Sequence, residues 1–439
     1  MKYFGTDGFR GRANETLTAI HAFRAGRFLG HYYGRGMRAR IVLGKDTRLS
    51  SYCFEYAFAA GAAASGADVF LLHVTTTPSV AFVVRTEGFD CGAMISASHN
   101  CYLDNGIKLF GGDVEKLSEE VLLLLEEYLD GGTLPLATGA DIGRTVDYAA
   151  GRNRYLACLL SLPRASFRGL RVGLDCANGS AWSLAKTVFD ALGAQVRCLG
   201  VSPDGTNINA GCGSTRPEGL CELVRLHSLD MGFAFDGDAD RCIAVDERGE
   251  IVNGDGILYL CAREMAEREE LGAGVVTTVL SNGGLLRALE RMGVVCTRTQ
   301  VGDKFVAGEM ARRGALLGGE PSGHIIFRKH ASTGDGILTA LKTAEIVAEK
   351  KCPLSVLLRG YSPLPQRACN VAVRGGAALV AGEVVQRAVR EAERAGVRMV
   401  VRPSGTEEVV RVLAEGEEAA AEEAVRRVER ALRESAEAL

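Results

Sequence analysis

Three stretches of the chain repeat one pattern: a short apolar strand, a turn, an amphipathic helix and further short apolar strands. The strands that this pattern predicts are Arg40–Leu43, Asp68–Leu72, Cys91–Ile95, Arg171–Leu174, Gln195–Leu199, Met231–Phe235, Val275–Val279, Val294–Thr297 and Ala315–Leu317. Helices are expected near Cys53–Ser65, Ala181–Leu192 and Gly283–Met292. Because strand–helix alternation is typical of α/β units, we expect three similar α/β domains with mixed, mostly parallel sheets.

The C-terminal part of the chain follows a different pattern, which predicts a smaller α+β domain. Its predicted elements are the strands Ala368–Val373, Val397–Val401 and Val409–Ala414, a long helix near Ala378–Ala395 and a charged amphipathic helix over Glu417–Leu439. A chain of 439 residues is too long for one hydrophobic core. We therefore place the domains at 1–150, 151–253, 254–365 and 366–439.

The charge and apolar patterning narrow the class of protein. The formal net charge is −3, with no excess of basic residues, so we expect neither nucleic acid nor an anionic membrane as a partner. Uninterrupted aliphatic runs such as Val121–Leu125 are too short to cross a bilayer. The segment Met1–Gly5 shows no apolar region of the kind that signal peptides carry.

The cysteines favour a reducing compartment. There are thirteen of them, an odd number without a C-x-x-C pair, which would be a liability in a secreted protein. Cys158 and Cys261 have apolar neighbours and are typical of small core residues. Metal-ligand spacing is missing, so no zinc site is expected. We predict a cytoplasmic enzyme.

The strongest chemical signal is an acidic triplet that directly follows the predicted strand Met231–Phe235. Asp236, Asp238 and Asp240 lie within about 14 Å of extended chain, so a slight curl can direct all three at one centre. Like charges so close repel unless a cation lies among them, and hard oxygen ligands suit Mg²⁺ or Ca²⁺. A solvated acidic turn is the plainer interpretation.

An EF-hand loop is a sharper rival for the same segment, because Glu247 is the twelfth residue counted from Asp236. That loop needs glycine at its sixth position, where this chain has Arg241. Cys242–Val245 is also predicted as a buried strand and not as the start of a helix. We therefore disfavour the EF-hand.

A serine loop follows the predicted strand Cys91–Ile95. Ser98 at the strand end is a candidate nucleophile with His99 directly after it, although Ser-Ala-Ser-His-Asn could also be a helix cap. The G-x-S-x-G pattern of hydrolases is absent. Lys108 follows nearby, and a lysine beside a phosphoryl group can balance charge or relay a proton.

Two glycine-containing turns carry polar side chains suited to a sugar phosphate. In Gly318–His324, Glu320 and Ser322 offer groups for vicinal hydroxyls and His324 either caps the turn or titrates, although an ordinary hairpin turn would look similar. Arg402–Glu408, with Arg411 close behind, combines arginine, hydroxyls and glycine as a phosphate cradle, with a structural turn as the alternative. Arg10 lies in a third, weaker glycine-flanked loop.

Taken together and in this order, these segments resemble the α-D-phosphohexomutase family over essentially the whole chain. Gly5–Arg10, the serine loop with Asp104–Lys108, and Arg402–Glu407 are most similar to the subgroup that acts on glucosamine phosphates. Asn207–Ser214 and Thr333–Gly336 strengthen the resemblance to that subgroup. The resemblance implies four domains around a central cleft, the last a phosphate-binding cap.

The resemblance also implies roles for individual residues. Ser98 matches the serine that carries the transferable phosphate, whose oxygen completes a Mg²⁺ shell formed by Asp236, Asp238 and Asp240. The implied catalytic residues are Ser98, His99, Lys108, Arg10 and Arg241. The implied substrate contacts are Glu320, Ser322 and His324 for the sugar, and Arg402, Ser404, Gly405, Thr406 and Arg411 for the non-reacting phosphate.

The implied activity interconverts glucosamine 6-phosphate and glucosamine 1-phosphate through phosphoserine and a sugar 1,6-bisphosphate, supplying amino-sugar nucleotide and cell-wall precursor synthesis. The same mechanism acting on mannose or glucose phosphates stays open, as does a metal-dependent sugar phosphatase or a non-catalytic sugar-phosphate sensor. The oligomeric state is also open, with a homodimer among the options. Three positions depart from the family pattern: Cys101 and Glu408 replace prolines, and Pro321 replaces the glutamine usual in the glucosamine subgroup.

Overall fold

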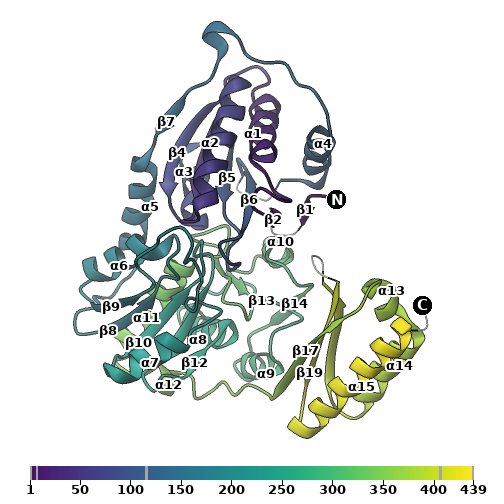
Figure 1. The fold of residues 1–439 in the computed structure, drawn as a ribbon. Helices are drawn as coiled ribbons and strands as arrows, with labels where there is room; N and C mark the ends of the chain where they lie inside the picture. The colour runs from purple at the N-terminus through teal and green to yellow at the C-terminus, as the bar shows by residue number, and fades with distance from the viewer. Residues whose placement is uncertain (1, 6–7, 114–116, 405–407, 438–439) are drawn as a thin grey trace. The chain divides into compact units, whose positions relative to one another are not determined.

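The computed structural model describes residues 2–5, 8–113, 117–404 and 408–437, and its contacts divide the chain into two compact units. Unit 1 comprises Met1–Thr278 and Thr297–Arg359, and unit 2 comprises Val279–Cys296 and Gly360–Leu439. The strands of Figure 1 form four sheets. None of the described helices is long and apolar enough to span a bilayer.

The first sheet has the strand order β1-β2-β6-β5-β3-β4-β7. Its strands are β1 Phe4–Gly5, β2 Gly8–Arg12, β3 Arg40–Lys45, β4 Asp68–Val74, β5 Cys91–Ile95, β6 Asp104–Gly111 and β7 Thr145–Asp147. The accompanying helices are α1 Ala19–Tyr33, α2 Leu49–Ala64, α3 Thr77–Glu87, α4 Glu119–Leu129, the short 3₁₀ helix Gly139–Asp141 and α5 Ala149–Ser161.

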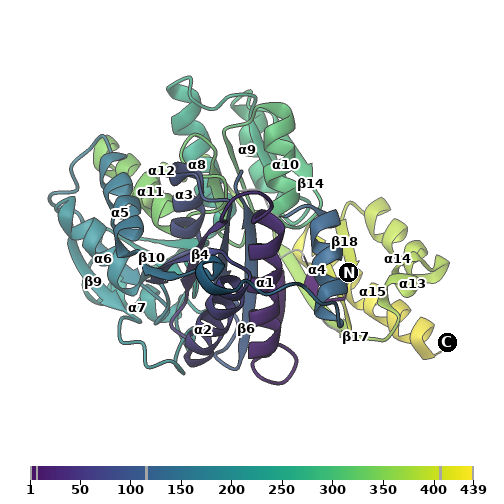
Figure 2. The same cartoon turned by 90° about the horizontal axis from the view of Figure 1, so that it is seen from above.

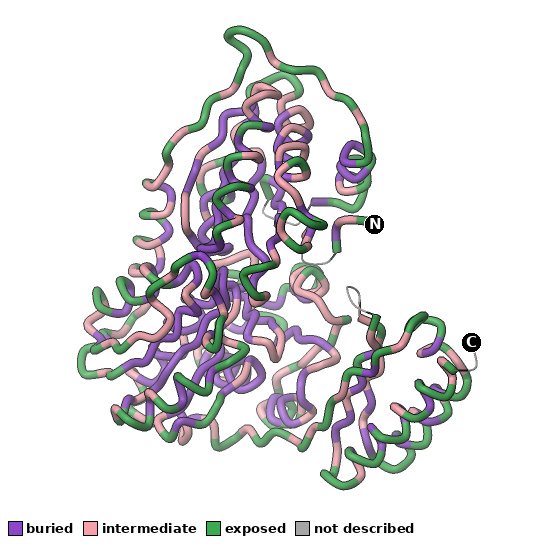
Figure 3. Tube along the Cα trace, viewed as in Figure 1, coloured by how far each residue is buried: buried purple, intermediate pink, exposed green. Residues whose placement is uncertain are grey.

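Alternation along β3 explains why helices cover both faces of this sheet. Ile41 and Leu43 belong to the core shared with α1 and α2, whereas Val42 packs on the opposite face with Val80 and Val84 of α3. Successive strand residues point to opposite faces, so an uninterrupted apolar strand must be covered twice. The result is the α/β/α layering seen from above in Figure 2, with the strands largely buried in Figure 3.

The second and third sheets have the orders β12-β11-β10-β8-β9 and β14-β13-β15-β16. Their strands are β8 Arg171–Asp175, β9 Gln195–Leu199, β10 Met231–Phe235, β11 Cys242–Asp246, β12 Ile251–Val252, β13 Val275–Thr278, β14 Cys296–Thr299, β15 Leu317–Gly319 and β16 Ile325–Phe327. The helices of this region are α6 Ala181–Ala191, α7 Glu218–Leu226, α8 Gly254–Glu267, α9 Gly283–Arg291, α10 Asp303–Arg313, α11 Gly336–Lys350 and α12 Leu354–Leu357.

Four strands recur in the same order in all three sheets: β6-β5-β3-β4, β11-β10-β8-β9 and β16-β15-β13-β14. In each set the first strand is antiparallel to the second, and the second is parallel to the third. This confirms the prediction of three similar α/β domains with mixed, mostly parallel sheets. The hairpin loops between the first two strands of each set, 96–103, 236–241 and 320–324, are therefore equivalent in topology.

Unit 2 contains the three-stranded antiparallel sheet β17-β19-β18. Its elements are β17 Gln366–Ala372, α13 Gly376–Ala381, α14 Glu383–Arg394, β18 Arg398–Pro403, β19 Val409–Glu415 and α15 Glu418–Glu437. The helices pack on the sheet through one core that includes Val371, Val385 and Val428. The predicted α+β character of the tail is confirmed.

The prediction of one long helix near Ala378–Ala395 was wrong. Gly382 has extended backbone, with ψ of 143°, and it separates α13 from α14. Its N–H still closes the first helix on Leu379 O, and its carbonyl accepts from Gln386 N–H of the second. Glycine makes such a break inexpensive, whereas the helical spacing of the flanking residues concealed it.

Each sheet lies within one of the four predicted segments, but the two compact units divide the chain differently, because α9 in the third segment belongs to unit 2. The four domain ranges therefore stay a prediction. Strand positions in the third segment also differ from expectation: β14 and β15 begin two residues later than predicted.

Candidate functional site

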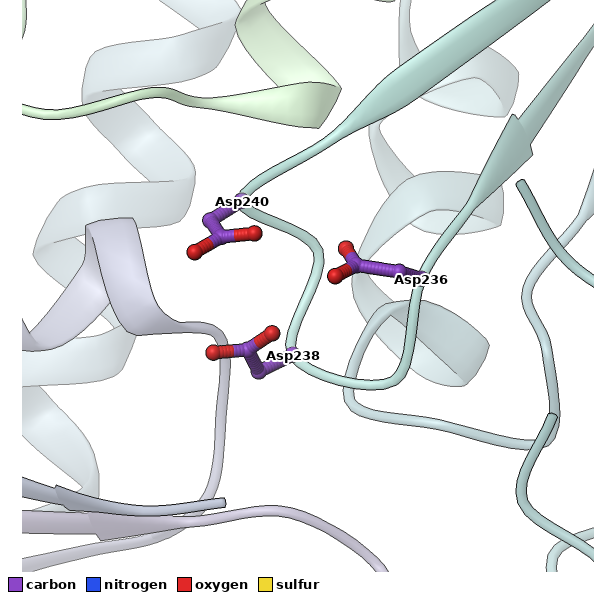
Figure 4. A group of neighbouring side chains, drawn as sticks. All are labelled: Asp236, Asp238 and Asp240. Atoms are coloured by element: carbon purple, nitrogen blue, oxygen red, sulfur yellow. The ribbon is translucent and has the colours of Figure 1, made fainter. Parts of the chain in front are cut away.

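The three aspartates of the acidic triplet converge in the loop between β10 and β11. Asp236, Asp238 and Asp240 are buried, and a carboxylate oxygen from each lies within 4.8 Å of the others. Figure 4 shows the three carboxylates facing a common centre. The loop curls through Ala239, whose φ is 55° and whose N–H donates to Asp236 O. The solvated-turn interpretation is thus wrong, and β11 begins where an EF-hand would need a helix.

Hydrogen bonds hold one side of the triplet. Lys108 Nζ lies 2.5 Å from Asp238 Oδ2 and 2.9 Å from Asp240 Oδ2. Thr77, the first residue of α3, also donates its hydroxyl to Asp238 Oδ2. Arg241 N–H donates to Asp236 Oδ1 at 3.2 Å.

The other side of the triplet is built for a ligand. Among the described residues, Asp238 Oδ1 and Asp240 Oδ1 are buried side-chain oxygens that accept no hydrogen bond. Buried polar atoms are normally satisfied, and carboxylate oxygens are preferred ligands of Mg²⁺ and Ca²⁺. The residues present therefore fit a hard divalent cation at this centre.

The pKa values of the acidic triplet are consistent with a divalent cation at its centre. Burial, together with the charges of Asp240 and Asp238, raises the pKa of Asp236 well above its ordinary value. Burial also opposes ionisation of Asp240, but Lys108, His324 and Arg241 outweigh it and hold the pKa of that carboxyl far below its usual range. Lys108 is partly exposed, and desolvation lowers the pKa of its ammonium group, but the charges of Asp238 and Asp240 outweigh this and raise it. A cation in the triplet would relieve the repulsion that raises the pKa of Asp236.

The serine loop meets the triplet directly. Ser98, in the hairpin loop between β5 and β6, is fully buried and donates from Oγ to Asp236 Oδ2 at 2.5 Å. Its φ of 54° is left-handed, which is uncommon for a residue other than glycine. No helix follows Ser98, because the chain continues into β6, so the helix-cap interpretation was wrong.

His99 and the basic residues surround the serine. His99 Nδ1 lies 3.4 Å from Ser98 Oγ and 3.2 Å from Arg241 Nη1. Arg10 is on β2, opposite Gly106 of β6, and its charge is near enough to oppose protonation of Lys108. The structure thus brings together Ser98 and the four other predicted catalytic residues.

The third hairpin loop carries the predicted sugar ligands. Ser322 Oγ lies 3.4 Å from Glu320 Oε2, and Glu320 Oε1 accepts from Gly302 N–H at 3.1 Å. This segment is indeed a hairpin between antiparallel strands, and its polar side chains gather on one turn. Pro321 contributes its carbonyl, which accepts from Gly254 N–H.

His324 is buried beside the acidic triplet. Its Nε2 accepts from Gly334 N–H at 3.0 Å, and its Nδ1 lies 3.8 Å from Asp240 Oδ2. An acceptor Nε2 assigns the proton of a neutral imidazole to Nδ1. The histidine therefore supports Asp240 and links the sugar loop to the acidic loop.

The predicted phosphate cradle lies in unit 2. Arg402 of β18 is the register partner of Arg411 of β19, so two cations stand opposite one another. Ser404 N–H donates to Val409 O at 2.8 Å. Gly405 and Thr406 lie outside the described residues. The extra charge of Glu408 lies 3.5 Å from Arg374 in an exposed ion pair.

Sequence reasoning gave no role to three residues that support the reactive loops. Besides Thr77, these are Arg48, which donates to Ser98 O from a fully buried guanidinium, and Asn209, which donates to the same carbonyl. Arg48 follows the end of β3, which lies next to the strand that precedes Ser98, and Thr77 follows the end of β4, one strand further along the sheet. Polar residues at carboxyl ends of neighbouring parallel strands are a signal that could have identified both.

Four family models match the chain in order. They are described as phosphoglucomutase/phosphomannomutase alpha/beta/alpha domain I over residues 1–134, domain II over 153–249, domain III over 253–363, and the C-terminal domain over 368–432. Together these matches span most of the chain.

Curated relatives match over nearly their full length. The chain is 56% identical to the phosphoglucosamine mutase of Lachnospira eligens, with 94% of each chain covered. It is 54% identical to the phosphoglucosamine mutase of Lachnoclostridium phytofermentans, again with 94% of each chain covered.

Solved structures share the fold. A phosphoglucomutase/phosphomannomutase family protein from Burkholderia thailandensis superposes with a TM-score of 0.83 at 26% identity, covering 99% of this chain and 98% of that one. An N-acetylphosphoglucosamine mutase from Aspergillus fumigatus, solved with GlcNAc-6P and magnesium, gives a TM-score of 0.72 at 17% identity, covering 99% and 96%. At that identity the second likeness concerns the fold alone.

Proposed function

The chain belongs to the phosphoglucomutase/phosphomannomutase family, and from this premise we propose that it is a phosphoglucosamine mutase, an isomerase that interconverts glucosamine 6-phosphate and glucosamine 1-phosphate. One observation carries the chemistry: the buried Ser98 Oγ lies 2.5 Å from Asp236 Oδ2, in a cluster whose other carboxylates keep two oxygens without hydrogen bonds among the described residues. Binding alone does not need a nucleophile beside a cation site. The choice of amino sugar is supported by the names of the full-length relatives.

In the proposed cycle Ser98 carries a phosphoryl group. The free sugar hydroxyl attacks phosphorus and loses its proton, the bond from phosphorus to Ser98 Oγ breaks, and a sugar 1,6-bisphosphate forms. The bisphosphate turns end for end, and its other phosphate returns to Ser98. Asp236, Asp238 and Asp240 would hold Mg²⁺, which supplies charge stabilisation for the phosphoryl oxygens.

The chain's own cations carry the remaining electrostatics. Two neighbouring carboxylates raise the pKa of Lys108. A lysine with a raised pKa is better suited to balance negative charge than to act as a base. Arg241 lies against His99, and His99 lies beside Ser98 Oγ. We infer that Arg10 and Arg241 bind phosphoryl oxygens, while His99 is a candidate to exchange the proton that moves during transfer.

Glu320 and Ser322 are proposed to contact the sugar hydroxyls, with His324 supporting Asp240. Arg402, Ser404, Gly405, Thr406 and Arg411 are proposed to bind the non-reacting phosphate. A single hydroxyl site and a single anion site can serve both orientations of the bisphosphate if they tolerate either end of the sugar.

Intact-mass measurement with peptide mapping tests the proposal. A mass increment of one phosphate located on Ser98 is the expected result, and Ser98→Ala should abolish both the increment and isomer formation. Ser161→Ala is the matched control, because Ser161 is exposed and donates only to Cys158 O of its own helix. Turnover of Ser98→Ala at the wild-type rate would end the proposal.

The alternatives predict different outcomes. A phosphomannomutase or phosphoglucomutase would favour mannose or glucose phosphates, and a tenfold preference in kcat/KM, about 1.4 kcal/mol, would reverse our choice of sugar. A phosphatase would release inorganic phosphate without forming the isomer. A sensor would bind sugar phosphate without turnover in either Ser98 variant or wild type.

We also propose a cytoplasmic location and a role for sugar 1,6-bisphosphate as activator. Fractionation of cells and reactivation of dephosphorylated enzyme by the bisphosphate are the respective tests. A homodimer stays a prediction, which light scattering of the purified chain would decide.

A further inference from the structure

The segment Asn207–Ser214, which the resemblance used only as a mark of subgroup, lies next to the reactive loops. Within it Asn209 has a φ of 59°, a left-handed conformation that asparagine tolerates better than most residues. Its backbone N–H donates to Ala177 O at 2.8 Å. The side chain reaches the serine loop.

The side-chain amide of Asn209 bonds to the serine loop. Its Nδ2 lies 2.9 Å from Ser98 O and 2.9 Å from Asn100 O. The same atom lies against the acidic loop, since a Cβ added to Gly237 would be only 3.1 Å from it. One amide group therefore bonds to the serine loop and lies close to the acidic loop.

Arg48, which lies between β3 and α2, is a second donor to the same two carbonyls. Arg48 Nη2 lies 3.0 Å from Ser98 O and 2.9 Å from Asn100 O. The Arg48 side chain is fully buried, and its Nε donates to Asp46 Oδ2 at 2.8 Å. Each carbonyl thus accepts from two side chains that lie 161 residues apart in the numbering.

The hydrogen bonds from Asn209 and Arg48 offset the backbone strain at Ser98. A left-handed φ at a serine is unfavourable, and such conformations persist when surrounding contacts over-determine them. With Ser98 O and Asn100 O held from both sides, the Ser98 side chain is directed at Asp236. Arg48 does this within its own domain, whereas Asn209 connects the serine loop to the domain that supplies the acidic triplet.

We propose that Asn209 is a positioning residue that registers the Ser98 loop against the acidic loop, so that a phosphoryl group on Ser98 Oγ lies over the cation site. The kinetic part of this proposal rests on the proposed function. The side-chain amide of Asn209 bonds to backbone carbonyls of Ser98 and Asn100, so its role would be exerted through the backbone of residues 98–100.

Two variants and one control test the proposal in the full-length protein. Asn209→Asp keeps shape and left-handed tolerance but turns an oxygen toward two carbonyl oxygens, and Asn209→Gly removes the side chain. Asn207→Asp is the control, because Asn207 Nδ2 donates to Ser202 O, which lies just before the segment, at 2.9 Å and not to the serine loop. Asn207→Asp perturbs the segment but keeps the hydrogen bonds from Asn209 to the serine loop. It therefore shows what a less ordered segment does by itself.

The first measurement is amide hydrogen exchange of the peptide that contains Ser98 and Asn100, without substrate. We expect at least a tenfold faster exchange there in both Asn209 variants, and the wild-type rate in Asn207→Asp. The second is single-turnover transfer from phospho-Ser98 to glucosamine 6-phosphate, with an expected fall of roughly ten- to a hundredfold and an unchanged KM.

The two measurements separate the possible failures. Wild-type exchange at Ser98 and Asn100 in Asn209→Asp would overturn the positioning role, as would faster exchange with an unchanged transfer rate or an equal loss of rate in Asn207→Asp. A wild-type protein that transfers no phosphate would overturn the proposed function instead, while the exchange measurement would still decide whether Asn209 holds the loop.

Discussion

At the scale of single residues, the two carboxylate oxygens of Asp238 have different functions. Lys108 and Thr77 both bind Oδ2, and Oδ1 is buried with no hydrogen bond among the described residues. A carboxylate fixed on one side presents the other in one direction, which lowers the cost of ordering a metal ligand. The ligand set therefore includes supporting residues that never touch the ion.

Thr77→Val should weaken divalent-cation binding by about ten- to a hundredfold, because it removes the hydroxyl that orients Asp238 while keeping the shape. Calorimetric titration with Mg²⁺, or Mn²⁺ titration followed by electron paramagnetic resonance, measures this directly. Thr75→Val is the matched control, since Thr75 is equally buried and its Oγ1 has no hydrogen-bond partner among the described residues. Equal affinity in the two variants would contradict the role of Thr77.

A second residue-scale prediction concerns pH. Burial raises the pKa of Asp335 to about 6 from its ordinary 3.8, against the opposing hydrogen bonds from Leu338 N–H and Tyr155 O–H. The folded protein then holds this proton more tightly than the unfolded chain. The associated stability is complete below about pH 4 and is lost as pH rises through about 6.

Asp335→Asn stays neutral and can still cap α11, so it should be more stable than wild type at pH 7.5, by up to about 3 kcal/mol. At pH 4 the two proteins should unfold at the same denaturant concentration. Urea titrations at both pH values measure the difference, and an advantage that is constant with pH would refute the assignment.

At the scale of elements, the equivalent hairpin loops depend on close backbone approach. A Cβ on Gly237 of the acidic loop would lie 2.5 Å from Ser98 O, too near for the loops to keep their places. Gly237→Ala should therefore lower phosphoryl transfer roughly a hundredfold with a smaller effect on thermal unfolding. Steady-state rates and melting curves test this.

Gly308→Ala is the control for that substitution. Gly308 is exposed within α10 and has nothing within 4 Å of an added Cβ. Its replacement should leave activity unchanged and raise stability slightly, because alanine favours a helix. If both alanine variants retained full activity, loop contact at Gly237 would not be required.

Much at this scale could be predicted because the signal is local. A short apolar run followed by Asp236, or by Ser98, predicts both the strand and the reactive group at its end. Asn209 could not be assigned in this way, because it acts on backbone carbonyls distant in sequence and follows no strand end. Gly382 was missed because one extended residue breaks a helix whose flanking periodicity continues.

At the scale of the whole molecule, the candidate residues belong to two units. The serine and acidic loops are in unit 1, and Arg402 and Arg411 are in unit 2. The two arginines face each other across antiparallel strands, and like charges in that position repel. Two guanidinium groups at register-paired positions suit the oxygens of a phosphate, which supports the proposed phosphate site.

Arg411→Gln should raise KM for glucosamine 6-phosphate about tenfold or more without changing Mg²⁺ affinity, because the two groups of residues lie in different units. Arg426→Gln, which removes an exposed charge paired with Glu422 on α15, should change neither quantity. Initial-rate kinetics and metal titration distinguish these outcomes, and a parallel loss of Mg²⁺ binding in Arg411→Gln would contradict the separation.

The bridge from Lys108 to Asp238 and Asp240 has a consequence for the apoprotein. An internal ammonium already offsets part of the acidic charge, so a chelator should inactivate the enzyme reversibly and lower its melting temperature without unfolding it at room temperature. Newly made chains could then complete their fold before loading. The Mg²⁺ concentration would then determine the fraction of active enzyme and not the fraction of folded enzyme.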